Sequence, residues 1–228
     1  MTWSWEHARE VAPYLVEGLW ITVQATLLAS AIALVAGLPI AIARTSSVRT
    51  LQVAVAGVVE FVRGTPILIQ LFFLFYVLPD FGVQFSPFAT GVLGLGIHYT
   101  AYTSEVYRAG IQSVPRGQWD ASAVLGLPLR RVWLAVITPQ ALVPVLPVLG
   151  NYVVMMFKES ALLSAITVQE LTFRARLIGG HFYRFLEPFT LMAVFYLVVS
   201  YTAVLIVRRL EHRIRRSRRV VVSTAAPE

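Results

Sequence analysis

Three long stretches without a charged side chain limit the possible folds of this 228-residue chain more than any other feature. They are residues 19–43, 132–157 and 188–207. A helix rises about 1.5 Å per residue, so each stretch can cross the roughly 30 Å hydrocarbon core of a bilayer. Only 14% of the residues are charged, whereas soluble domains average about 25%. The sequence therefore predicts an all-α polytopic membrane protein and excludes a soluble enzyme.

Two further segments bring the expected number of transmembrane helices to five. Residues 88–111 begin with an uncharged run and stay compatible with a helix to their end. The segment 53–78 needs more argument, because its uncharged part alone is too short to span a bilayer. A full crossing must include Glu60 and Arg63, which places charge inside the second span. The prediction is one transmembrane domain, residues 1–228, with spans at about 19–43, 53–78, 88–111, 132–157 and 188–207.

The distribution of basic residues predicts the orientation of these spans. With the N-terminus outside, the cytoplasmic segments carry thirteen arginines and the outer segments carry five basic residues. Basic residues favour the cytoplasmic side, so the N-terminus is expected outside and the C-terminus in the cytoplasm. The arginine-rich tail after residue 207 is expected to lie near anionic membrane lipid.

Composition also bears on partners and metals. The charges lie at the ends of apolar runs and not along one polar face, so no nucleic-acid partner is predicted. The chain has no cysteine, which excludes disulfides and thiolate metal ligands. No metal site is predicted.

The loop between the third and fourth spans carries the clearest signal outside the membrane. Pro115 in a first turn, and Gly126 with a proline two residues later, predict a short helix over about 115–126. Ser113 is expected to cap it. Asp120 lies in its N-terminal half, where a carboxylate is compatible with the helix dipole. These residues agree both with a docking element and with a plain amphipathic loop.

The same loop carries a family motif. From Gly117 to Gly126 it reads Gly-Gln-Trp-Asp-Ala-Ser-Ala-Val-Leu-Gly, and Pro139 follows thirteen residues later. This segment resembles the EAA loop of binding-protein-dependent ABC importers, with Asp120 in place of the usual glutamate. The strings at 61–73, 101–111 and 158–162 narrow the resemblance to permease subunits of polar amino acid importers of the histidine, glutamine and arginine type.

The resemblance implies a type I ABC importer transmembrane fold and ATP-driven, binding-protein-dependent import of polar amino acids. The implied partners are ATP-binding cassette subunits, a second permease copy or homologue, and an extracytoplasmic substrate-binding protein. This chain would be no enzyme and would bind no cofactor, since ATP and magnesium would be held by the partner subunits. It has no phosphate-binding loop motif. The implied location is the bacterial cytoplasmic (inner) membrane.

In that family the loop helix fits a groove of the ATP-binding subunit. The residues expected to make this coupling contact are Gly117, Gln118, Asp120, Ala121, Ser122 and Gly126.

Ionisable residues inside the membrane form a second candidate site. A charge at that depth costs about 2.5–3.5 kcal/mol, so it needs a partner or a water-filled path. Arg63 is expected near the midplane, with Glu60 on the same helical face. A structural ion pair and a contact of Arg63 with a substrate carboxylate both remain open. His98 in the third span and Glu159 after the fourth complete the candidate substrate path.

Two other functions agree with a polytopic membrane protein. A self-sufficient secondary carrier or channel for small polar solutes would need its own ion-coupling carboxylates and usually an internal repeat, and neither is evident. A non-transporting scaffold would leave Arg63 and the polar third span unexplained.

Overall fold

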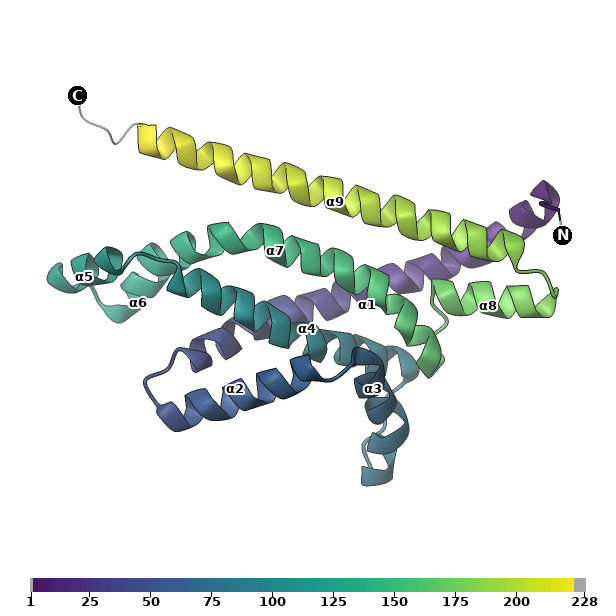
Figure 1. The fold of residues 1–228 in the computed structure, drawn as a ribbon, viewed down its shortest axis with the longest axis horizontal. Helices are drawn as coiled ribbons and strands as arrows, with labels where there is room; N and C mark the ends of the chain where they lie inside the picture. The colour runs from purple at the N-terminus through teal and green to yellow at the C-terminus, as the bar shows by residue number, and fades with distance from the viewer. Residues whose placement is uncertain (1, 224–228) are drawn as a thin grey trace.

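The computed structural model describes the backbone of residues 2–223 and the side chains of residues 2–211. Within that part of the chain, all regular structure is helical. The long helices are α1 (Trp5–Arg44), α4 (Pro87–Gln112), α7 (Thr138–Glu159) and α9 (Leu186–Ser223). Figure 1 shows them running side by side in one elongated bundle. They contain the predicted first, third and fifth spans and most of the fourth. The fourth span is preceded by α6 (Leu129–Arg131) and begins in the π-helical η3 (Val132–Ile137).

Three helical segments are long and apolar enough to cross a membrane. They are Trp5–Arg44, Leu129–Ile166 and Leu186–Glu211. The protein is therefore a multi-pass membrane protein. In the predicted arginine-rich anchor, Arg208 and Arg209 have described side chains, whereas those of Arg213, Arg215, Arg216, Arg218 and Arg219 lie outside the described residues.

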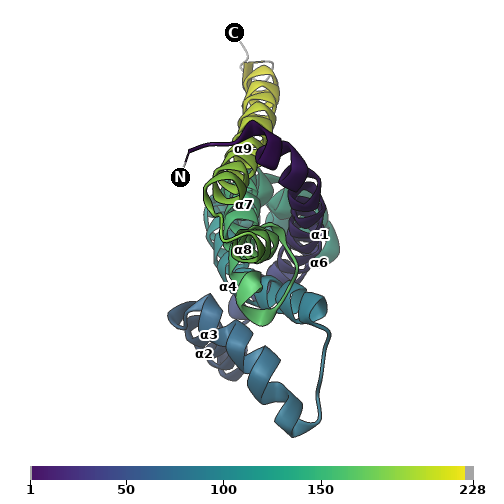
Figure 2. The ribbon, with the colours of Figure 1, turned by 90° about the vertical axis from the view of Figure 1, so that its right-hand side faces the viewer.

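The expectation of one continuous crossing over 53–78 is corrected by the structure. A bend of 100° separates α2 (Arg49–Gly64) from the helical segment Ile67–Phe81, which comprises α3 (Ile67–Phe72), the π-helical η1 (Phe73–Val77) and η2 (Leu78–Phe81). The two parts are long and apolar enough only together, as a broken span or a re-entrant loop. Pro66 has no backbone N–H and favours an extended residue before it, and Thr65 is extended at φ −105° and ψ 137°. Seen end-on in Figure 2, α2 and α3 lie on the side of the bundle away from α9.

Small residues let α1 and α4 approach closely. Gly37 faces the side chain of Thr103, and a Cβ at position 37 would also lie 3.2 Å from the amide nitrogen of Ser104. The Thr103 hydroxyl donates a 2.7 Å hydrogen bond to the carbonyl of Ala33, one turn away on α1. Small residues four apart are a common contact face between membrane helices.

The connection between α7 and α9 contains η4 (Ser160–Ile166) and α8 (Leu171–His181). Glu170 caps α8 and is fully buried. Its carboxylate accepts hydrogen bonds from the amides of Phe173 and Thr172, at 2.7 and 2.9 Å, and from the Tyr196 hydroxyl of α9 at 3.1 Å. Burial outweighs these bonds and raises the pKa of Glu170 to about 7.

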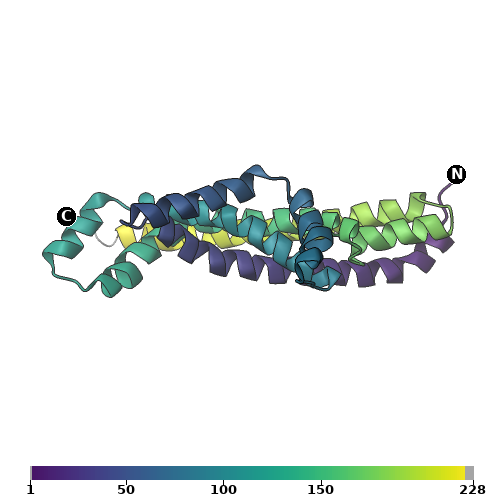
Figure 3. The same ribbon diagram turned by 90° about the horizontal axis from the view of Figure 1, so that it is seen from below.

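Different elements lie at the two ends of the bundle. Figure 3 shows the N-terminus beside α8 at one end and α5 (Arg116–Val124) at the other, where α9 also finishes. The short α5 helix and the N-terminus therefore lie at opposite ends of the long axis.

Candidate functional site

The α5 helix begins differently from the prediction. Pro115 occupies its N-cap position and provides no side-chain hydrogen bond. Ser113 ends α4 instead, and its hydroxyl donates a 2.7 Å hydrogen bond to the carbonyl of Gly110. The expected Ser113 cap was wrong because α4 continues to Gln112, which leaves too short a connection for Ser113 to reach the amides of α5.

The end of α5 follows the prediction. Gly126 adopts φ +60°, a left-handed conformation that glycine reaches without a Cβ penalty. The amide of Leu127 donates a 3.1 Å hydrogen bond to the carbonyl of Ser122, which closes the last turn as in a Schellman motif. Trp119 of α5 packs edge-on against Trp133 of η3, with ring centroids 5.4 Å apart. The helix is thus held against the base of the fourth span.

Most of the residues expected to dock a partner lie on the surface of this loop. Gly117, Gln118, Asp120, Ala121 and Gly126 are exposed. Ser122 is buried, and its hydroxyl donates to the carbonyl of Gln118 at 2.7 Å, so it supports α5 from inside. Next to them Val124 and Leu125 are 88% and 73% exposed. Two large apolar side chains at the tip of a short helix form a surface suited to contact with another protein.

The second candidate site surrounds Arg63, in the last turn of α2. Its Nη1 lies 3.2 Å from Glu60 Oε1, so the expected ion pair is present. Its guanidinium carbon also lies 5.3 Å from the ring centroid of Tyr102, within cation–π range. Arg63 Nε is buried and has no hydrogen-bond partner among the described residues.

A group of aromatic side chains connects Arg63 to the other predicted path residues. The rings of Tyr99, Tyr102 and Tyr152 have centroids 5.8–5.9 Å apart, and His98 lies 5.1 Å from Tyr102. Glu159 interacts electrostatically with Tyr99. Its Oε2 is buried without a hydrogen-bond partner in the described part of the chain. The predicted residues therefore border one cluster, which offers hydroxyls, ring faces and both signs of charge to a polar solute.

A charged network lies toward the α5 end of the bundle. Glu105 pairs with Arg108, as the spacing predicts, and also with Arg44 of α1, whose Nη1 is 2.5 Å from its carboxylate. Arg44 lies 3.9 Å from Glu60 of α2 as well. These pairs join α1, α2 and α4 through residues far apart in the sequence.

Sequence reasoning missed three of these participants. Gln70 forms a hydrogen bond with His98, with 3.2 Å between Gln70 Oε1 and His98 Nδ1. In the sequence, only its polar amide within an apolar run distinguishes it. Tyr152 follows Asn151 in a span whose other residues resemble ordinary packing residues, so the sequence does not mark it as part of a site. Arg44 directly ends the first uncharged run, and nothing local indicates that it points back to Glu105.

Comparison with known proteins identifies a family. Residues 17–216 match the sequence profile described as binding-protein-dependent transport system inner membrane component. The chain is 42% identical to the probable amino-acid ABC transporter permease protein y4tG of Sinorhizobium fredii, over 88% of this chain and 87% of that protein. It is 35% identical to the L-cystine transport system permease protein TcyB of Bacillus subtilis, over 90% and 88%.

Solved structures share the fold. A crystal structure of an amino acid ABC transporter with histidines superposes with a TM-score of 0.87 at 36% identity, covering 93% of this chain and all of that one. The MetNI methionine ABC transporter, in an inward-facing conformation, gives a TM-score of 0.78 at 18% identity over 90% of this chain and 98% of that one. Because the sequence identity to the MetNI transporter is low, that similarity shows a shared fold and nothing more.

Proposed function

We infer the function of this protein from the premise that the chain belongs to the family of binding-protein-dependent transport system inner membrane components. It is a permease subunit of an amino-acid ABC importer, with the type I importer permease fold. It is not an enzyme, because ATP hydrolysis is carried out by the ATP-binding partner. The observation that carries this conclusion is the match over nearly the whole chain to amino-acid permeases.

The arrangement in the membrane is part of the proposal. Five crossings are formed by α1, the broken α2–α3 unit, α4, the α6–α7 segment and α9. The N-terminus lies outside and the C-terminus in the cytoplasm of a bacterial inner membrane. The position of α5 at the end opposite the N-terminus supports this orientation, as does the excess of arginines on that side.

The proposed partners are two ATP-binding subunits that hold ATP and magnesium, a second permease copy or homologue, and an extracytoplasmic substrate-binding protein. α5 is the proposed coupling element. Its exposed tip at Val124 and Leu125 and its small residue Ala121 support a close contact. The packing of Trp119 on Trp133 would then pass movement of α5 to the fourth span.

The proposed substrate path runs beside the tyrosine cluster and is lined by Arg63, Glu60, His98 and Glu159. Ionisable residues within membrane spans face the bundle interior or a water-filled cavity and commonly mark solute pathways. The Glu60 pair holds Arg63 in place, and the buried Oε2 of Glu159 has no hydrogen-bond partner among the described residues.

The test of the coupling assignment is Ala121→Trp in the complete importer, with Gln84→Trp on the outer connection as the matched control. Both positions are exposed, so neither substitution is expected to disturb insertion. Ala121→Trp should abolish co-purification of the ATP-binding subunits and reduce ATP-driven uptake of amino acids by more than tenfold. Full uptake by Ala121→Trp would contradict the coupling role of α5. A wild-type complex that imports no amino acid would contradict the function itself.

A further inference from the structure

The side-chain amide of Gln70 has a fixed orientation. Its Nε2 lies 2.7 Å from the carbonyl oxygen of Val62, 3.1 Å from that of Thr65 and 2.6 Å from the Thr65 hydroxyl. That hydroxyl donates its own hydrogen to the carbonyl of Phe61 or Val62, so it accepts from Gln70. An amide turned the other way would place its oxygen against two carbonyl oxygens. The nitrogen therefore faces the bend, and Oε1 faces His98.

This orientation decides which ring nitrogen of His98 carries a proton. Gln70 Oε1 lies 3.2 Å from His98 Nδ1, and an amide oxygen can only accept a hydrogen bond, so Nδ1 carries the hydrogen. His98 is 7% exposed within α4 and forms no ion pair with a described carboxylate. The cost of burying a charge therefore favours a neutral ring. A neutral ring that is protonated at Nδ1 has a lone pair on Nε2.

The Nε2 atom of His98 is free to accept a hydrogen bond. It makes none with any described residue, yet it is not sealed from solvent as the partnerless Nε2 of His7 is. The ring lies beside Tyr102 and Tyr99, with centroids 5.1 and 5.6 Å away. A lone pair and the faces of tyrosine rings both attract a cationic N–H donor. The surroundings of His98 therefore suit an ammonium group.

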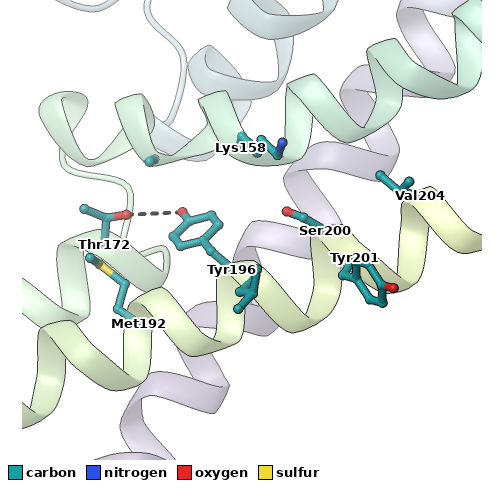
Figure 4. A pocket seen from close by; sticks show the side chains of 9 residues that line it. Lys158, Thr172, Met192, Tyr196, Ser200, Tyr201 and Val204 are labelled. Atoms are coloured by element: carbon teal, nitrogen blue, oxygen red, sulfur yellow. Dashed lines mark hydrogen bonds between the residues drawn. The ribbon is translucent and has the colours of Figure 1, made fainter.

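The groove between α7 and α9 is a less suitable place for such a group. Figure 4 shows Tyr196 turned toward Thr172, and their hydroxyl oxygens are 3.2 Å apart. The Tyr196 hydroxyl is also within 3.1 Å of the carboxylate of Glu170, and the lining of the groove is mostly apolar. Its tyrosine hydroxyl is thus already engaged within the chain, whereas the acceptor of His98 is not.

We propose that Gln70 is a positioning residue of the substrate path, which holds His98 as the neutral tautomer protonated at Nδ1. His98 Nε2 then accepts a hydrogen bond from the ammonium group of the transported amino acid. This assignment rests on the proposed import function. The amide that bridges the bend of the second span also sets the hydrogen-bonding role of His98, so this acceptor depends on an intact bend.

Nitrogen-15 NMR of the importer complex in lipid bilayers tests the tautomer. The ring nitrogens of histidine are labelled, and the signals of His98 are those absent from a His98→Asn complex. We expect a proton on Nδ1 and none on Nε2. Gln70→Leu should lose this single-tautomer signal and show protons on both nitrogens in different molecules, because the acceptor at Oε1 is gone. Gln52→Leu, at an exposed position of α2, is the matched control and should give the wild-type signal.

Two spectra would overturn the proposal. One is a wild-type signal from a ring protonated at Nε2 alone or at both nitrogens, and this measurement holds even where Gln70→Leu does not assemble. The other is an unchanged Nδ1–H signal in an assembled Gln70→Leu complex, which would show that Gln70 does not set the tautomer.

Uptake by two variants of His98 separates contact with the solute from support of the fold. His98→Gln places an amide near the position of Nε2, whereas His98→Asn places one near Nδ1 and keeps a partner for Gln70. A contact through Nε2 predicts that His98→Asn reduces binding-protein-dependent uptake at least tenfold and that His98→Gln retains more uptake than His98→Asn. The opposite order, or wild-type uptake by His98→Asn, would overturn the contact. A wild-type complex that takes up no amino acid would instead contradict the import function and would leave the tautomer result unaffected.

Discussion

Gln70 Nε2 donates a 2.7 Å hydrogen bond to the backbone carbonyl of Val62, across the 100° bend between α2 and α3. In a continuous helix that carbonyl would accept from the amide of residue 66, but residue 66 is a proline. The same nitrogen lies 2.6 Å from the hydroxyl of Thr65. The Thr65 hydroxyl also donates to the Val62 carbonyl, at 3.2 Å, so two side chains replace the backbone donor that the proline lacks.

Gln70→Leu should destabilise the permease, because it removes the shorter of two side-chain hydrogen bonds to the Val62 carbonyl and also the bond to the Thr65 carbonyl. A loss of about 1–3 kcal/mol corresponds to a decrease of roughly 3–10 °C in the apparent Tm of a protein of this size. The measurement is thermal unfolding of the purified protein in detergent. Gln52→Leu, at an exposed position of α2, is the control and should have little effect. Equal Tm values for Gln70→Leu and wild type would show that the bend needs no such donor.

Gly37 and Gly57 allow a matched test of the contact between α1 and α4. A Cβ at Gly37 would collide with the side chain of Thr103, whereas nothing lies within 4 Å of a Cβ at Gly57. Gly37→Ala should cost about 1–3 kcal/mol through overpacking. Gly57→Ala should be neutral or stabilising by up to about 1 kcal/mol, because alanine favours the helix. Denaturant titration of both variants measures the difference, and an equal effect would place the close contact elsewhere.

Glu170 predicts a pH dependence of stability with a definite sign. Its pKa in the folded protein is about 7, above the ordinary value of 4.5, so the folded state binds the proton more tightly. Stability should therefore fall by up to about 3 kcal/mol as the pH rises from 4.5 to 7, and then change little. Apparent Tm values at pH 5 and pH 8 measure this fall. Glu170→Gln should reduce the difference between the two pH values, and Glu10→Gln, on the exposed outer part of α1, should preserve it.

The five-span arrangement predicts the location of two reporter sites. A reporter fused after Arg219 should be cytoplasmic, and one inserted near Asp80 should be outside. The side chain of Arg219 lies outside those described by the structure, whereas Asp80 is exposed in η2. Activity of a compartment-specific reporter measures both. An extracytoplasmic C-terminus would be incompatible with five crossings from an outer N-terminus.

The features that the sequence predicts correctly depend on neighbours along the chain. Uncharged length determines which helices can span a membrane, and Gly126 ends α5 because glycine reaches a left-handed backbone without strain. The pairs Glu60–Arg63 and Glu105–Arg108 follow from helical spacing. The family resemblance can also be recognised from the sequence, because each of its motifs is a continuous segment of the chain.

The features that sequence reasoning missed depend on which helix faces meet. Arg44 reaches Glu105 only because α1 and α4 pack closely at Gly37, and Gln70 reaches His98 only because the chain bends at Pro66. Helical periodicity determines the spacing of residues within one span, whereas the depth and partners of a side chain depend on the relative positions of several spans. Helix formation and the chemistry of each helix thus follow from local sequence, whereas the packing of the helices sets which polar groups find a hydrogen-bond partner.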